Sequence, residues 1–206
     1  MRRSLPCPAA VLLALALTPA ARADDYQWDN VHSSMTFKIE HLGISYVHGR
    51  FNEVAGQFSF DPKDPAKARF ALTIQVASID TNQKLRDEHL RTADFFEVEK
   101  YPTMSYRSTG IRPDGDGFVM EGELTLKGVT LPVPLRLVIN GFSVDPYASD
   151  PAAGARAGFT ATGEINRMDF GVSYNGPVPG GGVLLGEKVQ IILEIEAALQ
   201  ASSHPE

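Results

Sequence analysis

The chain is almost free of cysteine. Cys7 is its one thiol, and it lies near the N-terminus, ahead of a short apolar run. A lipoprotein signal has its cysteine directly after such a run, so a lipid anchor is not expected. If this N-terminal segment is removed, the mature chain has no disulfide, no thiol nucleophile and no thiolate metal ligand. Its hydrophobic core alone must then hold the fold.

The chain also lacks a long hydrophobic run. Its apolar stretch, "AAVLLALAL", is shorter than the ~20 residues that a membrane-spanning helix needs. The stretch follows a basic start and precedes an Ala-x-Ala signal that ends at Ala23. We therefore interpret residues 1–23 as a secretory signal peptide, cleaved after Ala23. The expected product is an exported protein without stable membrane insertion, and residues 24–206 form its single domain.

Basic charge is scarce. Residues 1–23 hold three of the 19 Lys and Arg residues and none of the 25 Asp and Glu residues, so the mature chain has a charge of 16 − 25 = −9. Such an acidic domain repels the phosphate backbone of nucleic acids and anionic lipid surfaces. No nucleic-acid partner is expected.

Alternation of apolar and polar residues with period two is abundant. It occupies residues 35–41, 69–77, 118–128, 129–139, 158–165 and 189–197, with turn-forming residues between several of these runs. In "MTFKIEH", for example, Met35, Phe37 and Ile39 fall on one side of the predicted strand. This period is typical of β-strands with one buried face. The sequence therefore predicts an all-β domain with no internal repeat.

About eight antiparallel strands, each with one apolar face, must form a closed or sandwiched arrangement. The interior of an eight-stranded barrel is either just filled by side chains or holds one small ligand. The run at residues 129–139 would reach roughly 36 Å at ~3.3 Å per residue, which is taller than a compact core requires. We therefore expect a barrel whose interior takes a long, thin apolar molecule. Pro132 and Pro134 favour an edge or irregular strand.

One segment, "RDEHLRTADFF" at residues 86–96, concentrates charged side chains within a predicted helix of about residues 81–96. Asp87 and His89 have the chemistry for acid–base catalysis. However, the chain has no "GxSxG" elbow and no "HExxH" helix. A helix surface whose charges are solvated or paired is the favoured interpretation, and no catalytic residue is assigned.

A metal site is not expected either. Zinc needs three or four convergent ligands, and the histidines of the chain are scattered. His41 and His48 are seven residues apart, which puts them on opposite faces of an unbroken strand. No metal ligand and no required cofactor are therefore assigned.

Four stretches resemble the YceI-like family of exported proteins. They are "FKIEHLGISYVHGRFNEVAGQFSFDP", "VASIDTNQKLRDEHLRTADFFEVEKYPTMSYRST", "GELTLKGVTLPV" and "INRMDFGVSYNG", in consistent order. The resemblance covers about Tyr26 to Ala198, and it implies a periplasmic location. The resemblance implies an extended antiparallel lipocalin-like β-barrel that binds one long apolar molecule, a polyisoprenoid or an isoprenoid quinone. It also implies that residues 86–96 are a connection packed across the barrel, without catalytic duty.

In that connection, Phe95 and Phe96 are expected to fill apolar space, while Asp87, His89 and Arg91 tie it to neighbouring loops. We expect Asp80 and Thr81 to cap the start of its helix, because their side-chain oxygens suit unpaired helix N–H groups. A departure from a tight hairpin is the Ala- and Pro-rich insert at Asp145–Arg156, whose effect on the barrel mouth the sequence leaves open.

The predicted ligand-binding residues follow from the inward side of each strand. The apolar lining is expected to comprise Phe37, Ile39, Phe58, Phe60, Leu72, Ile74, Val76, Leu124, Leu126, Leu135, Leu137, Ile191, Leu193 and Ile195. Tyr106, His41 and Arg50 are candidates for contact with a polar head group.

Two other classes of function stay open at this point. The first is an interaction module that docks on a membrane cytochrome through its acidic surface. The second is an enzyme that modifies isoprenoids through Asp87 and His89. A homodimer formed through a barrel edge near Pro132 and Pro134 is also conceivable. The sequence leaves the identity of the lipid undetermined.

Overall fold

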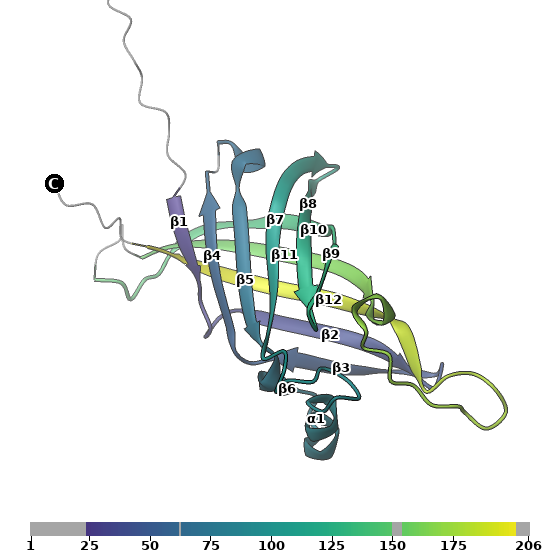
Figure 1. The fold of residues 1–206 in the computed structure, drawn as a ribbon. Helices are drawn as coiled ribbons and strands as arrows, with labels where there is room; N and C mark the ends of the chain where they lie inside the picture. Colours follow the sequence, from purple (N-terminus) through teal and green to yellow (C-terminus); the bar gives the residue numbers. More distant parts are fainter. Residues whose placement is uncertain (1–23, 62, 150–153, 201–206) are drawn as a thin grey trace, which may run out of the picture.

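The computed structural model describes residues 24–61, 63–149 and 154–200. The predicted signal peptide therefore lies outside the described residues. Twelve strand segments form one antiparallel sheet (Figure 1). They are β1 (Asp24–Trp28), β2 (Ser34–His41), β3 (Ser45–Phe51), β4 (Val54–Phe60), β5 (Arg69–Gln75), β6 (Ile79–Asp80), β7 (Thr103–Asp114), β8 (Gly117–Leu126), β9 (Val129–Pro132), β10 (Leu135–Val144), β11 (Ala155–Asn166) and β12 (Leu185–Leu199).

Eight of these segments close a barrel. The order β1-β4-β5-β7-β8-β10-β11-β12 returns to its start because β1 also pairs with β12, with Tyr26 opposite Leu199. The other segments extend these strands: β2 continues β1 along β12, and β3 precedes β4 and pairs with β2. The predicted eight-stranded antiparallel barrel is thus confirmed, with several long strands divided by bends.

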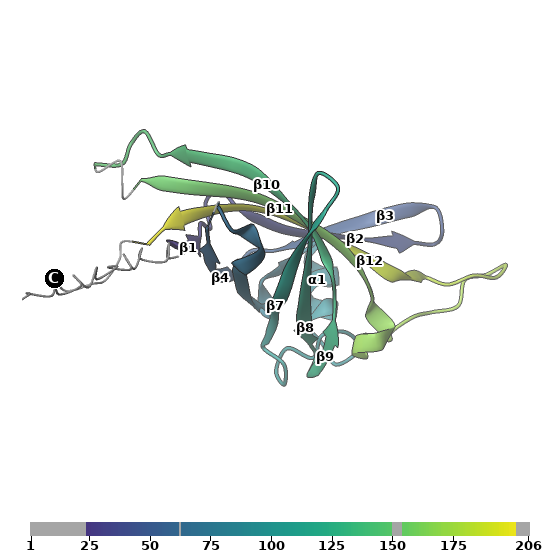
Figure 2. The same cartoon turned by 90° about the horizontal axis from the view of Figure 1, so that it is seen from above.

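Two hairpins extend away from the centre of the barrel. The β2–β3 hairpin and the β10–β11 hairpin extend toward opposite sides of the molecule (Figure 2). Of the insert at 145–156, residues 150–153 lie outside the described part. Its two described ends are joined by the Asp145 N–H to Gly154 carbonyl bond of 2.8 Å and by an Arg156–Asp145 ion pair of 3.0 Å. The insert is therefore the turn of the β10–β11 hairpin.

The two prolines interrupt a strand, as their positions predicted. β9 and β10 both pair with β8, and Pro132 lies opposite Glu123 while Leu135 lies opposite Met120. The pairing thus resumes in the same register after a two-residue break. Among the described strands, β9 pairs with β8 alone. Its other side is unpaired because β11 pairs with β10 only from Arg136 onward and does not reach β9. This leaves β9 as a short edge.

The helical prediction was too long. Helix α1 covers only Lys84–Leu90, and residues 91–101 consist mainly of turns. Gln83 caps the helix by accepting a 2.7 Å bond from the Arg86 N–H, so the predicted capping by Asp80 and Thr81 was wrong. Asp80 instead accepts the Asn82 N–H at 2.8 Å, which fixes the turn before the helix. Three further short 3-10 helices are Pro65–Lys67 (η1), Val76–Ser78 (η2) and Arg167–Phe170 (η3).

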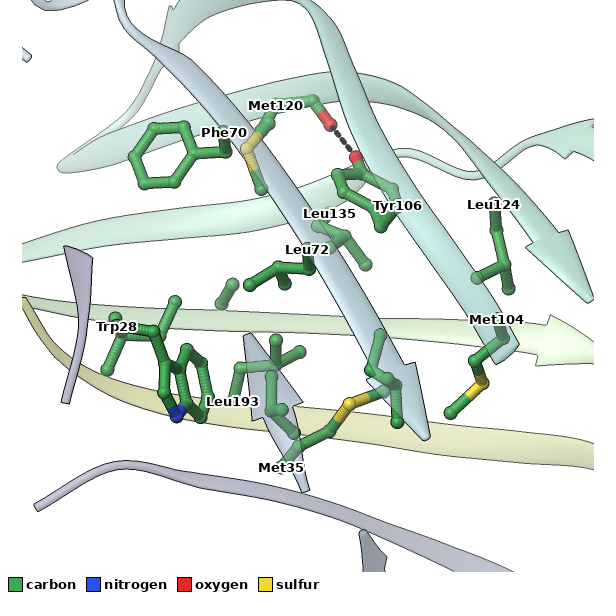
Figure 3. Packing of buried hydrophobic residues seen from close by; sticks show 14 of the residues in the cluster. Trp28, Met35, Phe70, Leu72, Met104, Tyr106, Met120, Leu124, Leu135 and Leu193 are labelled. Carbon is green, nitrogen blue, oxygen red and sulfur yellow. Dashed lines mark hydrogen bonds between the residues drawn. The ribbon is translucent and has the colours of Figure 1, made fainter. Parts of the chain in front are cut away.

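A buried aromatic cluster fills the half of the barrel formed by β4, β5 and β11. Phe159 is fully buried, and its ring lies 5.3 Å from the rings of both Phe60 and Phe70 and 6.4 Å from that of Phe58. Leu72, Leu135, Leu193 and other apolar side chains continue the packing along the barrel (Figure 3). This half of the barrel is a solid hydrophobic core.

Candidate functional site

A cavity of about 280 Å³ lies in the other half of the barrel. Its walls come from β2, β3, β7, β8, β11 and β12, from α1 and the turns after it, and from η3 with residues 172–185. The alternation of the strands explains the apolar wall. Phe37 pairs with Ile191, and Ile39 pairs with both Val189 and Val47, so inward-facing residues of three strands meet.

Six of the residues predicted to contact a ligand line this cavity: Phe37, Ile39, His41, Leu124, Leu126 and Ile191. Sequence reasoning did not include several other apolar wall residues. Phe51, Leu90, Phe95 and Phe96 are among them, and the last three come from the connection after β6 rather than from a strand. These last three residues show no period-two signal. Phe95 and Phe96 were expected to fill apolar space, and both pack against the core in the cavity wall.

The other predicted lining residues lie outside the cavity walls. Phe58, Phe60, Leu72, Ile74, Val76, Leu135, Leu137, Leu193 and Ile195 are buried members of the packed core. The cavity of about 280 Å³ therefore occupies one half of the expected bore, and buried aromatic rings lie in the other half. Arg50 is exposed on β3 between two buried neighbours, Gly49 and Phe51, so its side chain points away from the interior.

Tyr106 is also outside the cavity, and its hydroxyl already has partners. It donates toward the carbonyl of Met120 at 3.2 Å (Figure 3). It also lies 3.1 Å from the carbonyl of Val133 and donates toward that oxygen. Burial, with a smaller contribution from the charge of Glu121, raises the pKa of Tyr106 above its usual range. The phenol therefore stays neutral and connects β7 to β8 and to the break after β9.

The charged connection is tied to the barrel by hydrogen bonds, as predicted. The buried Asp87 carboxylate accepts the N–H of Thr81 at 2.9 Å and its hydroxyl at 2.5 Å. Arg86 donates to the Thr81 hydroxyl and carbonyl, both at 2.7 Å. Arg91 donates to the carbonyls of Ala77 and Ile79, both at 2.8 Å. These side chains fasten α1 against β6.

His89 lies in the cavity wall within an aromatic group. Its ring makes edge-to-face contacts with Phe95 and Tyr174, with both centroid distances at 5.0 Å, and its Nε2 lies 2.8 Å from an Asp94 carboxylate oxygen. Such aromatic contacts fix the ring orientation. Phe95 also packs on Tyr174 at 4.8 Å, so the connection and the segment after η3 are joined.

Arg167 is the polar wall residue that sequence reasoning missed. It opens η3 directly after β11, is only 3 % exposed, and lines the cavity. Its Nε donates to the Gly186 carbonyl at 2.9 Å, and its Nη1 donates to the carbonyls of Val172 and Tyr174. Burial lowers the pKa of Arg167 from its ordinary value, and the charge of Glu187 opposes that shift. The one sequence feature that could have pointed to Arg167 as a wall residue is its position directly after a predicted strand, within "INRMDFG".

Away from the cavity, Asp29, His32 and Glu196 bring three potential metal-ligand atoms within 4.8 Å of one another. The His32 Nδ1 lies 3.1 Å from Asp29 and 3.8 Å from Glu196, and Glu196 also pairs with Arg156 at 3.5 Å. These contacts connect the turn after β1 to β11 and β12. We assign the cluster this structural role.

The fold and the cavity define a class of protein: a lipocalin-like antiparallel barrel with an apolar internal site beside one short helix. No helix in the described part of the chain is long and apolar enough to cross a membrane. The match to a family model is specific. Residues 26–197 match the YceI-like domain, and the chain belongs to that family.

Relatives of known sequence agree. The chain is 39 % identical over 184 residues to Protein YceI of Escherichia coli O157:H7, covering 88 % of this chain and 90 % of that one. It is 40 % identical over 180 residues to a UPF0312 protein of Serratia proteamaculans, covering 86 % and 88 %. The resemblance drawn from the four sequence stretches is thus confirmed.

Solved structures share the fold. A YceI protein from Campylobacter jejuni has a TM-score of 0.65 at 27 % identity, covering 95 % of this chain and all of the other. BcnA from Burkholderia cenocepacia has a TM-score of 0.66 at 26 % identity, covering 83 % and 99 %. A polyisoprenoid binding domain from Saccharophagus degradans has a TM-score of 0.60 at 15 % identity, covering 87 % and 100 %. At that identity its likeness concerns the fold alone.

Proposed function

We propose that this protein is a periplasmic carrier that binds the apolar chain of a polyisoprenoid or isoprenoid quinone for transport, storage or sequestration. The observation that carries the proposal is the apolar cavity of about 280 Å³ inside a closed barrel. Its wall is dominated by aliphatic and aromatic side chains, such as Phe37, Leu126 and Ile191. A relative of the same fold is a polyisoprenoid binding domain, which supports this choice of ligand class.

The physical driving force is removal of hydrocarbon from water. Each buried CH₂ contributes about 0.8 kcal/mol, and the aliphatic and aromatic part of the wall needs no hydrogen bond in return. Small-molecule pockets commonly measure about 300–1,000 Å³, so this cavity takes a segment of a long chain rather than the whole of it. A missing methylene changes such binding little. Selectivity must therefore come from the polar wall residues.

Binding rather than catalysis is proposed because the acid–base candidates are otherwise engaged. Asp87 accepts two hydrogen bonds from Thr81 and holds α1 in place. His89 is held by Asp94 and two aromatic rings. If the protein were an enzyme that uses His89, His89→Ala would stop turnover of a bound isoprenoid. A carrier releases that lipid chemically unchanged, with or without His89.

The test is organic extraction and native mass spectrometry of the protein purified from its native compartment, followed by uptake of a prenylated quinone. A carrier contains, or takes up, about one lipid per chain. Failure to find co-purified lipid, together with no uptake of the added quinone, would refute the proposal. A protein that acts only by docking on a membrane cytochrome would give that negative result.

A variant pair locates the binding. Ile39→Trp places an indole on the cavity side of β2, so we expect uptake to fall at least tenfold. Glu40→Trp puts the same group on the exposed side of the same strand, outside the cavity wall, and should leave uptake unchanged. Equal uptake by both variants would place the ligand elsewhere.

A further inference from the structure

The cavity wall has a charge character opposite to that of the protein. The whole chain carries a formal charge of −6, or −9 without residues 1–23. Yet the wall contains Arg86, Arg167, His41 and His89, and none of its described residues is Asp or Glu. Hydrogen-bond donors and positive charge therefore face an otherwise apolar space. Such a surface favours a ligand with an oxygen acceptor over a pure hydrocarbon.

The two arginines of the wall differ in what they can offer. Arg86 is exposed, and its Nε and Nη2 donate to Thr81. Arg167 is buried, and its Nε and Nη1 hold three backbone carbonyls around η3 and the start of β12. Those bonds fix the plane of the Arg167 guanidinium, so its remaining nitrogen has a defined position.

That remaining nitrogen, Nη2 of Arg167, has no acceptor among the described residues, although it is buried. A buried donor without a partner has lost its hydrogen bonds to water without replacement, and the cost is larger when the donor is charged. No carboxylate of the wall neutralises the guanidinium charge. Because Arg167 lines the cavity, a ligand held there can supply the acceptor that the described residues do not.

We propose that Nη2 of Arg167 is the anchor for the oxygen-bearing head group of the ligand. Accordingly, the cavity takes prenyl compounds that end in a carbonyl or an anionic oxygen, and it discriminates against the bare hydrocarbon. This inference rests on the proposed function, because it concerns the polar end of the same ligand. A small outward shift of the guanidinium, or of the wall beside it, accompanies binding, since Nη2 is buried without ligand.

The experiment compares three probes that share one prenyl chain: one ends in a quinone ring, one in a phosphate and one in a methyl group. Their dissociation constants are measured with the full mature protein and with Arg167→Met. A charge-assisted hydrogen bond in a buried site predicts that at least one oxygen-bearing probe binds about 10- to 100-fold tighter than the hydrocarbon. In Arg167→Met that ratio should fall to near one.

The ratio separates anchoring from structural support. Arg167→Met also removes the bonds to three carbonyls, and structural damage would weaken all three probes equally; that outcome overturns the proposal. Arg69→Met is the matched control, because Arg69 also donates to backbone carbonyls, those of Lys67 and Ala68, but lies outside the cavity wall. It should leave all three constants unchanged.

Two results from the wild-type protein keep the proposal testable if the variant fails to fold. Equal affinity of the wild type for the hydrocarbon and for both oxygen-bearing probes overturns it. Nitrogen NMR of the Arg167 guanidinium should show a shifted, slowly exchanging Nη2 with the favoured probe only. Binding of none of the three probes would instead count against the proposed function itself, so the two failures are distinguishable. Preference for the quinone or for the phosphate then identifies the head group.

Discussion

Replacing Phe159 by alanine tests whether half of the barrel is solid. The Phe159 side chain is fully buried and contacts the rings of Phe58, Phe60 and Phe70. Truncation of a buried phenylalanine costs about 3–5 kcal/mol, and each aromatic pair lost adds to the cost of the removed area. We therefore expect Phe159→Ala to lie near the upper end of that range.

The assay is urea unfolding combined with a thermal scan. At about 2–4 °C per kcal/mol for a domain of this size, the melting temperature should fall by about 10–20 °C. Phe142→Ala is the control, because Phe142 contacts Phe60 at a similar ring distance of 5.7 Å but is 48 % exposed. It should cost about 1 kcal/mol or less.

The difference in stability loss between Phe159→Ala and Phe142→Ala shows whether this half of the barrel is a packed core. If Phe159→Ala costs no more than Phe142→Ala, the aromatic cluster is not a packed core, and an open bore through the whole barrel becomes the better description. If Phe159→Ala is strongly destabilised and its remaining folded protein binds ligand as before, the ligand occupies only the half beside α1.

Three further predictions concern other parts of the fold. Hydrogen bonding and charge of Asp29 raise the pKa of His32 from its ordinary value of 6.5, and Asp29→Asn should lower that pKa in an NMR titration. Because the folded pKa is the higher one, the stabilisation is full below the ordinary histidine pKa while Asp29 is ionised, and it is lost as the pH rises through the folded pKa. Gly49→Ala would place a methyl group inside van der Waals contact of the Phe37 ring, so it should displace that ring and weaken ligand uptake severalfold. Unchanged uptake would contradict the assigned wall. Tyr106→Phe removes a hydroxyl bound to two buried carbonyls and should lower the unfolding free energy by about 1–3 kcal/mol, whereas a neutral result would mean that those carbonyls find other donors.

The barrel could be predicted because its signal is local. Each strand carries its own alternation, and the runs around Phe37, Leu124 and Ile191 show it without reference to one another. Closure then follows from the need to bury one face of every strand. The interruption at Pro132 and Pro134 was likewise predictable, because proline lacks the N–H that a ladder requires.

The division of the barrel into a filled and an open half could not be predicted this way. Phe58 and Phe37 have the same inward position on their strands, and the pattern makes no distinction between them. Their difference arises from what lies across the barrel. Phe58 meets Phe70 and Phe159, whereas Phe37 faces the cavity beside Phe51. That depends on the register and bending of strands far apart in the sequence.

The polar residues of the site were hard to predict for a related reason. Arg50 and His41 were both candidates for contact with a polar head group, yet His41 lines the cavity and Arg50 points outward. Arg167 lies in a 3-10 turn after β11, where no period indicates direction. Its burial follows from three backbone carbonyls that only the folded segment of residues 172–186 presents. A charged residue at a strand end has no sequence signal for turning inward.

The packed half of the barrel offsets the lower stability of the cavity half. A buried guanidinium with an unmatched donor and partly open apolar walls both lower stability, and residues 24–206 contain no cysteine that could offset this with a disulfide. The aromatic cluster around Phe159 supplies that stability from the far half. Filling the cavity half with side chains would make the barrel more stable but would remove the space for a ligand. The unequal filling of one continuous barrel is therefore what allows a small domain to keep a binding site.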